Sequence, residues 1–127
     1  MLSAVASVLL VEDDAVILRV LEINFRAEGF DVRTATSRSA VLLALHDARP
    51  DVIVLDLGLP DADGATLLDE IVSSDGVADV PVVIVSGRDA DETDHDGYAS
   101  RVEAVLRKPV DPALVVETVR GVLRDAG

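Results

Sequence analysis

The stretch Val8-Leu9-Leu10-Val11-Glu12-Asp13-Asp14 joins an uninterrupted apolar run to three consecutive acids. A short run that is apolar on both faces is typical of a strand buried inside a parallel sheet. Further strand-like runs follow, and the sequence predicts five strands, at residues 7–11, 31–35, 51–55, 80–85 and 102–106. The acids therefore follow directly on a buried strand.

The segments between these strands have the spacing of amphipathic helices. Gly29 is placed to end the first helix, and Pro50 lies beyond the end of the second. Asp14 and Asp111 are suited to cap the first and last helices, and Pro112 follows Asp111 at the first helical turn. The residues expected on the apolar faces are Ile17, Val20, Leu21 and Phe25 in the first helix, Val41, Leu42 and Leu45 in the second, Leu67, Leu68, Ile71 and Val72 in the third, and Leu114, Val115, Thr118, Val119 and Val122 in the last.

Alternation of strands and helices predicts an α/β fold, a doubly wound five-stranded parallel sheet with helices on both faces. One segment departs from the alternation. Residues 89–100, where a fourth helix is expected, carry five acids and almost no apolar stripe. We expect a helix there to be short or irregular.

The composition suits a single domain over residues 1–127 with an aliphatic core, because half of the chain is hydrophobic and only 2% is aromatic. The net charge of −13 argues against direct binding to nucleic acid or to anionic membranes. No apolar run is long enough to span a bilayer, the N-terminus has no basic leader, and the chain lacks cysteine. These features favour a cytoplasmic protein.

Reactive side chains follow several of the predicted strands. Ligands of a doubly wound sheet bind beyond the carboxyl ends of its strands, so these side chains are expected to converge. Clustered carboxylates favour a hard divalent cation such as Mg²⁺, and with the ion bound a carboxylate can act as the nucleophile toward a phosphoryl group. The residues concerned are Glu12, Asp13 and Asp14 after the first strand, Asp56 after the third, Ser86 after the fourth and Lys108 after the fifth.

Four motifs in this order resemble the receiver domain of two-component response regulators. They are Val8 to Asp14, the stretch Val54-Leu55-Asp56-Leu57-Gly58-Leu59-Pro60-Asp61 with Gly64, Val83-Ile84-Val85-Ser86-Gly87, and Arg107-Lys108-Pro109. The resemblance runs over nearly the whole chain. It implies a flavodoxin-like fold with strand order 2-1-3-4-5.

The resemblance also implies a role for each site residue. Asp56 would accept the phosphoryl group, and Mg²⁺, or Mn²⁺ in its place, would be held by Asp13, Asp56 and the backbone carbonyl of Gly58, with Glu12 acting through a water. Lys108 would pair with the phosphoryl group, and Ser86 would be the switch hydroxyl. The Lys108–Pro109 peptide bond would be cis.

Two features depart from the family pattern. Val105 stands where receivers usually carry a switch aromatic, and residues 89–100 lack the usual fourth-helix pattern. Tyr98, the only tyrosine, could replace the missing ring or simply pack on a neighbouring helix. Gly58 leaves the site open to water, so we expect faster loss of the phosphoryl group than with a bulky residue. His46 and His95 are expected at the surface.

Three functions remain open at this point. The first is a phosphoacceptor that receives its phosphoryl group from a histidine kinase or phosphotransfer protein, and that is not an enzyme beyond catalysing its own phosphorylation and dephosphorylation. The second is a phosphorylation-independent pseudo-receiver. The third, a flavin or nucleotide binder, is disfavoured because no glycine-rich phosphate loop is present. The signal would pass to a downstream protein or to a missing output domain, and a homodimer is possible.

Overall fold

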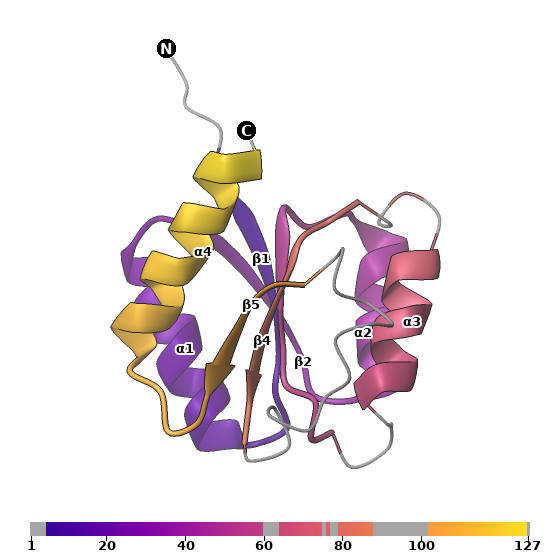
Figure 1. Cartoon of the computed structure of the whole chain (residues 1–127), viewed down its shortest axis with the longest axis horizontal. Coiled ribbons are helices and arrows are strands. Elements are labelled where there is room, and N and C mark those ends of the chain that lie inside the picture. The colour runs from indigo at the N-terminus through magenta and orange to yellow at the C-terminus, as the bar shows by residue number, and fades with distance from the viewer. Residues whose placement is uncertain (1–4, 60–63, 75, 77–78, 88–101, 127) are drawn as a thin grey trace.

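The computed structural model of the chain describes residues 5–59, 64–74, 76, 79–87 and 102–126. Within these residues it contains five strands and four helices (Figure 1). Their order is β1 (Ser7–Val11), α1 (Ala15–Ala27), β2 (Asp31–Ala35), α2 (Arg38–Asp47), β3 (Val52–Leu55), α3 (Gly64–Ser73), β4 (Val82–Ser86), β5 (Val102–Arg107) and α4 (Pro112–Ala126).

The strands form one parallel sheet in the order β2-β1-β3-β4-β5. This confirms the doubly wound topology and the strand order 2-1-3-4-5. Val11 pairs with Leu55 in the register of β1 and β3, so the residues that follow these two strands leave the sheet at the same level. The register therefore places Glu12 beside Asp56.

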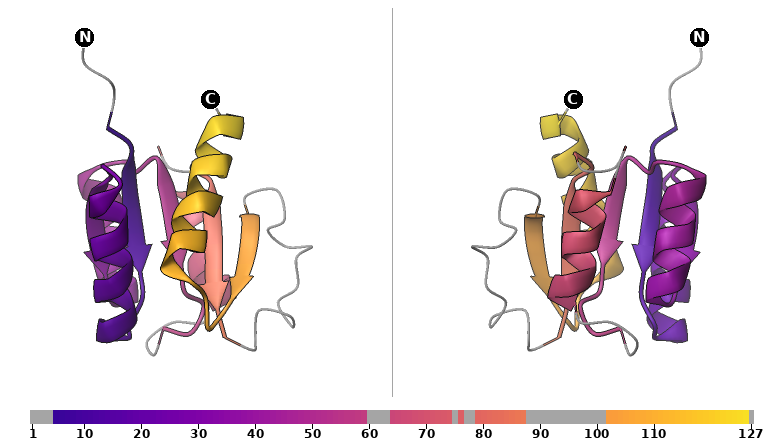
Figure 2. Two further views of the ribbon diagram at one scale, coloured as in Figure 1. Left: turned by 90° about the vertical axis from the view of Figure 1, so that its left-hand side faces the viewer. Right: turned by 90° about the vertical axis from the view of Figure 1, so that its right-hand side faces the viewer.

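Helices cover both faces of the sheet, as the sequence predicts. Figures 1 and 2 show α1 and α4 on one face and α2 and α3 on the other. Successive residues of β1 point to opposite faces, so Leu9 packs with the α2 and α3 side chains, and Leu10 packs with those of α1 and α4. The two aliphatic cores hold the strand ends in fixed positions.

The helix ends follow the local chemistry of the chain. Asp14 caps α1, because its Oδ1 accepts hydrogen bonds from the backbone N–H groups of Val16 at 2.9 Å and Ile17 at 3.0 Å. Gly29, with φ of +90°, follows the last turn of α1. Asp111 caps α4, since its Oδ1 accepts from Ala113 N at 2.9 Å. These three boundary predictions are confirmed.

Some sequence predictions need correction. Val20 is 39% exposed and Leu114 is 49% exposed, although both were expected on core-facing sides of their helices. Each of these helices packs one narrow stripe against the sheet, and these two residues lie beside the stripe. Two strands begin later than expected, at Val52 and Val82, and β5 extends to Arg107. Ser86 ends β4 rather than following it.

The unusual segment at residues 89–100, with Tyr98 and His95, lies outside the described residues. The described helices include none that is long and apolar enough to cross a membrane.

Candidate functional site

The site lies beyond the carboxyl ends of the central strands β1 and β3. Glu12 N donates to Ala35 O at 3.1 Å, and Asp56 N donates to Val11 O at 3.0 Å, so each acid is fixed by the neighbouring strand. The two residues are only 2% and 4% exposed. A buried carboxylate is unfavourable unless it is paired or protonated, so two buried acids side by side either attract a cation or have raised pKa values.

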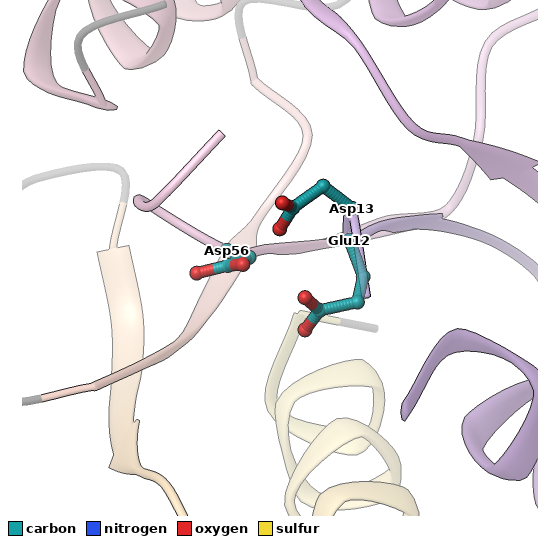
Figure 3. A group of neighbouring side chains, drawn as sticks. All are labelled: Glu12, Asp13 and Asp56. Carbon is teal, nitrogen blue, oxygen red and sulfur yellow. The ribbon is translucent and has the colours of Figure 1, made fainter. Parts of the chain in front are cut away.

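Three carboxylates gather at this point. Oxygens of Glu12, Asp13 and Asp56 lie within 4.8 Å of one another. Figure 3 shows the side chains of Glu12 and Asp13 directed toward the side on which Asp56 lies. Asp13 is exposed, and no hydrogen bond or ion pair ties its side chain to another described residue. Asp13 thus supplies a solvent-facing carboxylate beside two buried ones.

Lys108 supplies the positive charge within the cluster. Its Nζ lies 2.8 Å from Glu12 Oε1 and 3.2 Å from Asp56 Oδ2, and its side chain is 21% exposed. The backbone holds it there, because Lys108 N donates to Ser86 O at 2.7 Å. The Lys108–Pro109 peptide bond is cis, the form that the resemblance implies.

The charges perturb one another. Burial, together with the neighbouring Asp56 carboxylate, raises the pKa of Glu12 to about 7, even though the hydrogen bond from Lys108 acts to lower it. Burial acts to lower the pKa of Lys108, but the hydrogen bond to Glu12 and the charges of Asp56 and Glu12 outweigh it, so this pKa is raised. Lys108 therefore stays positively charged at neutral pH.

Ser86 has a buried hydroxyl that is unpaired among the described residues. The residue is 3% exposed, and within the described part of the chain its side chain makes no hydrogen bond. Buried hydroxyl groups are nearly always hydrogen-bonded, so this hydroxyl is available to donate to an oxygen atom bound at the site. Ser86 lies at the end of β4, and its backbone carbonyl accepts the hydrogen bond from Lys108 N. Ser86 therefore lies beside Lys108, where an acceptor such as a phosphoryl oxygen would bind.

Gly58 contacts the central carboxylate. Its backbone N–H donates to Asp56 Oδ1 at 3.0 Å. A Cβ added at Gly58 would lie 3.4 Å from that oxygen, within ordinary contact distance. Glycine at this position therefore places no side-chain atom against the Asp56 carboxylate.

The remaining residues that the sequence singled out are not part of the carboxylate and lysine cluster. Asp14 is occupied as the cap of α1. Val105 is half-buried and packs with the core on the α2 and α3 side. His46 is exposed at the end of α2. The sequence did not predict the direct ion pair between Glu12 and Lys108. The side chain of glutamate is longer than that of aspartate, and this greater reach was the signal in the sequence for such a contact.

The donor set suits a hard divalent cation. Carboxylate oxygens from Asp13 and Asp56 are of the type that Mg²⁺ or Mn²⁺ prefers, and Asp13 is exposed to the solvent that would supply the waters that Mg²⁺ retains. The residues present therefore fit the metal that the resemblance implies.

Comparison with known proteins agrees with this geometry. The family model of the response regulator receiver domain matches residues 8–120. The transcriptional regulatory protein PrrA of Mycobacterium tuberculosis is 35% identical over 120 residues, which are 94% of this chain and 51% of that protein. The transcriptional regulatory protein AfsQ1 of Streptomyces coelicolor is 35% identical over 118 residues, 93% of this chain and 51% of that protein. The chain spans about half the length of these relatives.

Solved structures show the same fold. A putative response regulator from Chloroflexus aurantiacus superposes with a TM-score of 0.85 at 26% identity, covering 95% of this chain and 99% of that one. The chemotaxis response regulator CheY4 of Vibrio cholerae superposes with a TM-score of 0.84 at 24% identity, over 94% of this chain and 99% of its own. The latter likeness concerns the fold alone.

Proposed function

This chain belongs to the response regulator receiver domain family of two-component signalling, and on that premise we propose that Asp56 accepts a phosphoryl group from a histidine kinase or phosphotransfer protein. The observation that carries the proposal is the grouping of two buried carboxylates, one exposed carboxylate and one lysine at a single strand edge. The family match alone would be equally compatible with a receiver that has lost its chemistry.

The transfer is a substitution at phosphorus. A carboxylate oxygen of Asp56 attacks the phosphorus of an N-phosphorylated imidazole, a P–O bond forms and the P–N bond breaks. The electron pair stays on the imidazole nitrogen, which takes a proton from solvent, and Asp56 becomes an acyl phosphate. Hydrolysis returns the carboxylate and inorganic phosphate, so the domain takes part in its own phosphorylation and dephosphorylation and is a signalling module rather than an enzyme.

Each neighbouring residue has a part in this chemistry. Asp13, Asp56 and the backbone carbonyl of Gly58 would hold Mg²⁺ or Mn²⁺, which when bound neutralises charge on the phosphoryl oxygens. Lys108 is already 3.2 Å from Asp56 Oδ2, close enough to pair with a phosphoryl oxygen there. The buried Ser86 hydroxyl, unpaired among the described residues, would donate to another phosphoryl oxygen and act as the switch.

The alternative is a pseudo-receiver that binds partners without phosphate. Val105 favours it, because a half-buried valine has no ring to reorient when the Ser86 hydroxyl moves. The paired Lys108 and Asp56 favour the phosphoacceptor, since they place a nucleophilic carboxylate beside an ammonium group that can pair with a phosphoryl oxygen.

We further propose that residues 1–127 form one receiver domain, which signals through a downstream protein or an output domain. The two relatives are named as transcriptional regulatory proteins, and the match covers 51% of each. Transcriptional control through an attached output domain is therefore one such route. The strongly acidic composition favours basic protein partners over nucleic acid.

The test uses a small phosphodonor. We would incubate the protein with MgCl₂ and acetyl phosphate and compare its intact mass with that of Asp56→Asn under the same conditions. We expect one acid-stable, base-labile phosphoryl adduct on the wild type alone, lost when EDTA removes the metal. A folded wild-type protein without an adduct would establish the pseudo-receiver.

A further inference from the structure

Both carboxylate oxygens of Glu12 are engaged by the protein itself. Oε1 lies 2.8 Å from Lys108 Nζ, and Oε2 accepts a hydrogen bond from Asp14 N at 3.1 Å. The side chain is 3% exposed. A carboxylate fixed at both oxygens is oriented by its partners, and its closest partner is the ammonium of Lys108.

Asp13 provides the contrast. It is the next residue and belongs to the same acidic group, but its side chain is exposed and makes no hydrogen bond or ion pair within the described residues. Its oxygens are free to bind a hydrated cation. Two adjacent acids thus have different surroundings, one facing solvent and one facing the lysine.

Lys108 in turn is held more closely by Glu12 than by Asp56, at 2.8 Å against 3.2 Å. An ammonium group has three N–H donors, so these two contacts leave one for a phosphoryl oxygen. A flexible four-carbon side chain would otherwise lose considerable rotamer freedom when it meets the phosphoryl group. Because Glu12 already fixes the Lys108 side chain, this loss of rotamer freedom does not have to occur when the phosphoryl group binds.

We propose that Glu12 is a positioning residue for Lys108, holding the ammonium against Asp56, and that this contact, rather than a water-mediated contact to the metal, is its main contribution. The inference rests on the proposed phosphoacceptor function, whose chemistry it refines. Glu12 acts through the lysine, and Asp13 and Asp56 remain the carboxylates that bind the metal. The retained Lys108–Glu12 contact need not break when phosphate arrives.

The chain offers an unusually clean test, because Lys108 is its only lysine. Protein grown with ¹³C,¹⁵N-lysine gives a single set of side-chain NMR signals, which report the surroundings of this ammonium without metal or phosphate. The spectra would be recorded at about pH 8, where Glu12 is ionised. Glu12→Gln keeps the shape of the side chain and removes its charge.

We expect Glu12→Gln to move the Lys108 Cε and Nζ signals toward those of a free lysine. Asp13→Asn is the matched control, since it removes one charge from the same group, and it should leave the signals close to those of the wild type. Equal displacement in both variants would overturn the proposal. If Glu12→Gln fails to fold, Asp56→Asn decides: signals that stay distinct from free lysine support the Glu12 contact, and their collapse contradicts it.

A second measurement asks whether the contact matters for transfer. At saturating MgCl₂ with acetyl phosphate, Glu12→Gln should slow adduct formation about tenfold, the equivalent of one charge-assisted hydrogen bond. In a Lys108→Met background the same substitution should change the remaining rate very little. An undiminished effect in that background would assign Glu12 to the metal. If the wild type itself forms no adduct, the phosphoacceptor function fails, while the NMR result still decides the Glu12–Lys108 contact.

Discussion

At Gly58, the absence of a side chain leaves only backbone atoms of this residue beside the Asp56 carboxylate. The glycine N–H donates to Asp56 Oδ1, and a Cβ would approach the same oxygen to 3.4 Å. A longer side chain would therefore extend over the face of the acyl phosphate from which water attacks.

We predict that Gly58→Met slows loss of the phosphoryl group by roughly two- to tenfold, because excluding water hinders hydrolysis. Adduct decay would be followed by intact mass after acetyl phosphate is removed, with Gly58→Ala as the smaller control. Unchanged decay in Gly58→Met would show that position 58 does not control water access.

We predict that Glu12 gives metal binding a pH dependence. In the metal-free protein its pKa is raised to about 7, from burial first and the Asp56 carboxylate next, so it binds a proton below that pH. A nearby divalent cation favours the ionised form, so metal binding must displace that proton. The sign follows: affinity for Mg²⁺ falls as the pH drops below about 7.

Calorimetric titration of Mg²⁺ at about pH 6 and about pH 8 would check this prediction, with two buffers of different protonation enthalpy to count the proton released. Glu12→Gln, which has no proton to lose, should bind with nearly the same affinity at both pH values. Equal affinities for the wild type would show that Glu12 is already ionised at the lower pH.

At the scale of the helix, Asp14 illustrates how one residue can have a structural role inside an acidic group. Its carboxylate accepts hydrogen bonds from two backbone N–H groups of α1, while its own backbone N–H donates to Glu12 Oε2. The sequence alone places three acids together, and only the cap pattern separates Asp14 from the two that face the site.

We predict that Asp14→Ala lowers the free energy of unfolding by about 1 kcal/mol through loss of the cap. Urea denaturation followed by far-UV circular dichroism is suitable, because the chain lacks tryptophan. The control is Asp69→Ala on the exposed surface of α3, which removes the same charge without removing a cap. Equal losses in the two variants would assign the effect to charge rather than capping.

The elements also show where sequence patterns are informative. Buried parallel strands are apolar on both faces, so β1, β3 and β4 were predicted to within two residues at either end. Helical spacing places a residue only to within about a quarter turn, so it could not show that Val20 and Leu114 face outward. The Glu12–Lys108 pair joins residues 96 positions apart in sequence, which no local pattern reports.

At the scale of the whole molecule, the net charge of −13 connects the proposed metal site with the stability of the fold. Acids gathered at one strand edge repel one another, and a single lysine within the described site offsets only part of that repulsion. The aliphatic cores on both faces of the sheet supply the stability that holds these acids together. A cation that binds only the folded arrangement must add to it.

We therefore predict that MgCl₂ raises the melting temperature of the protein, by the equivalent of about 2.7 kcal/mol when the metal is at a hundredfold excess over its dissociation constant. NaCl at matched ionic strength should raise the melting temperature less, because its ions screen all the surface acids but do not bind specifically to the acidic group. Asp13→Asn should lose most of the magnesium effect and keep the sodium effect, since it removes a proposed metal ligand while the overall charge changes by only one unit. If magnesium and sodium were equally effective on the wild type, the stabilisation would come from general screening, and the acidic group at the ends of β1 and β3 would not be a binding site.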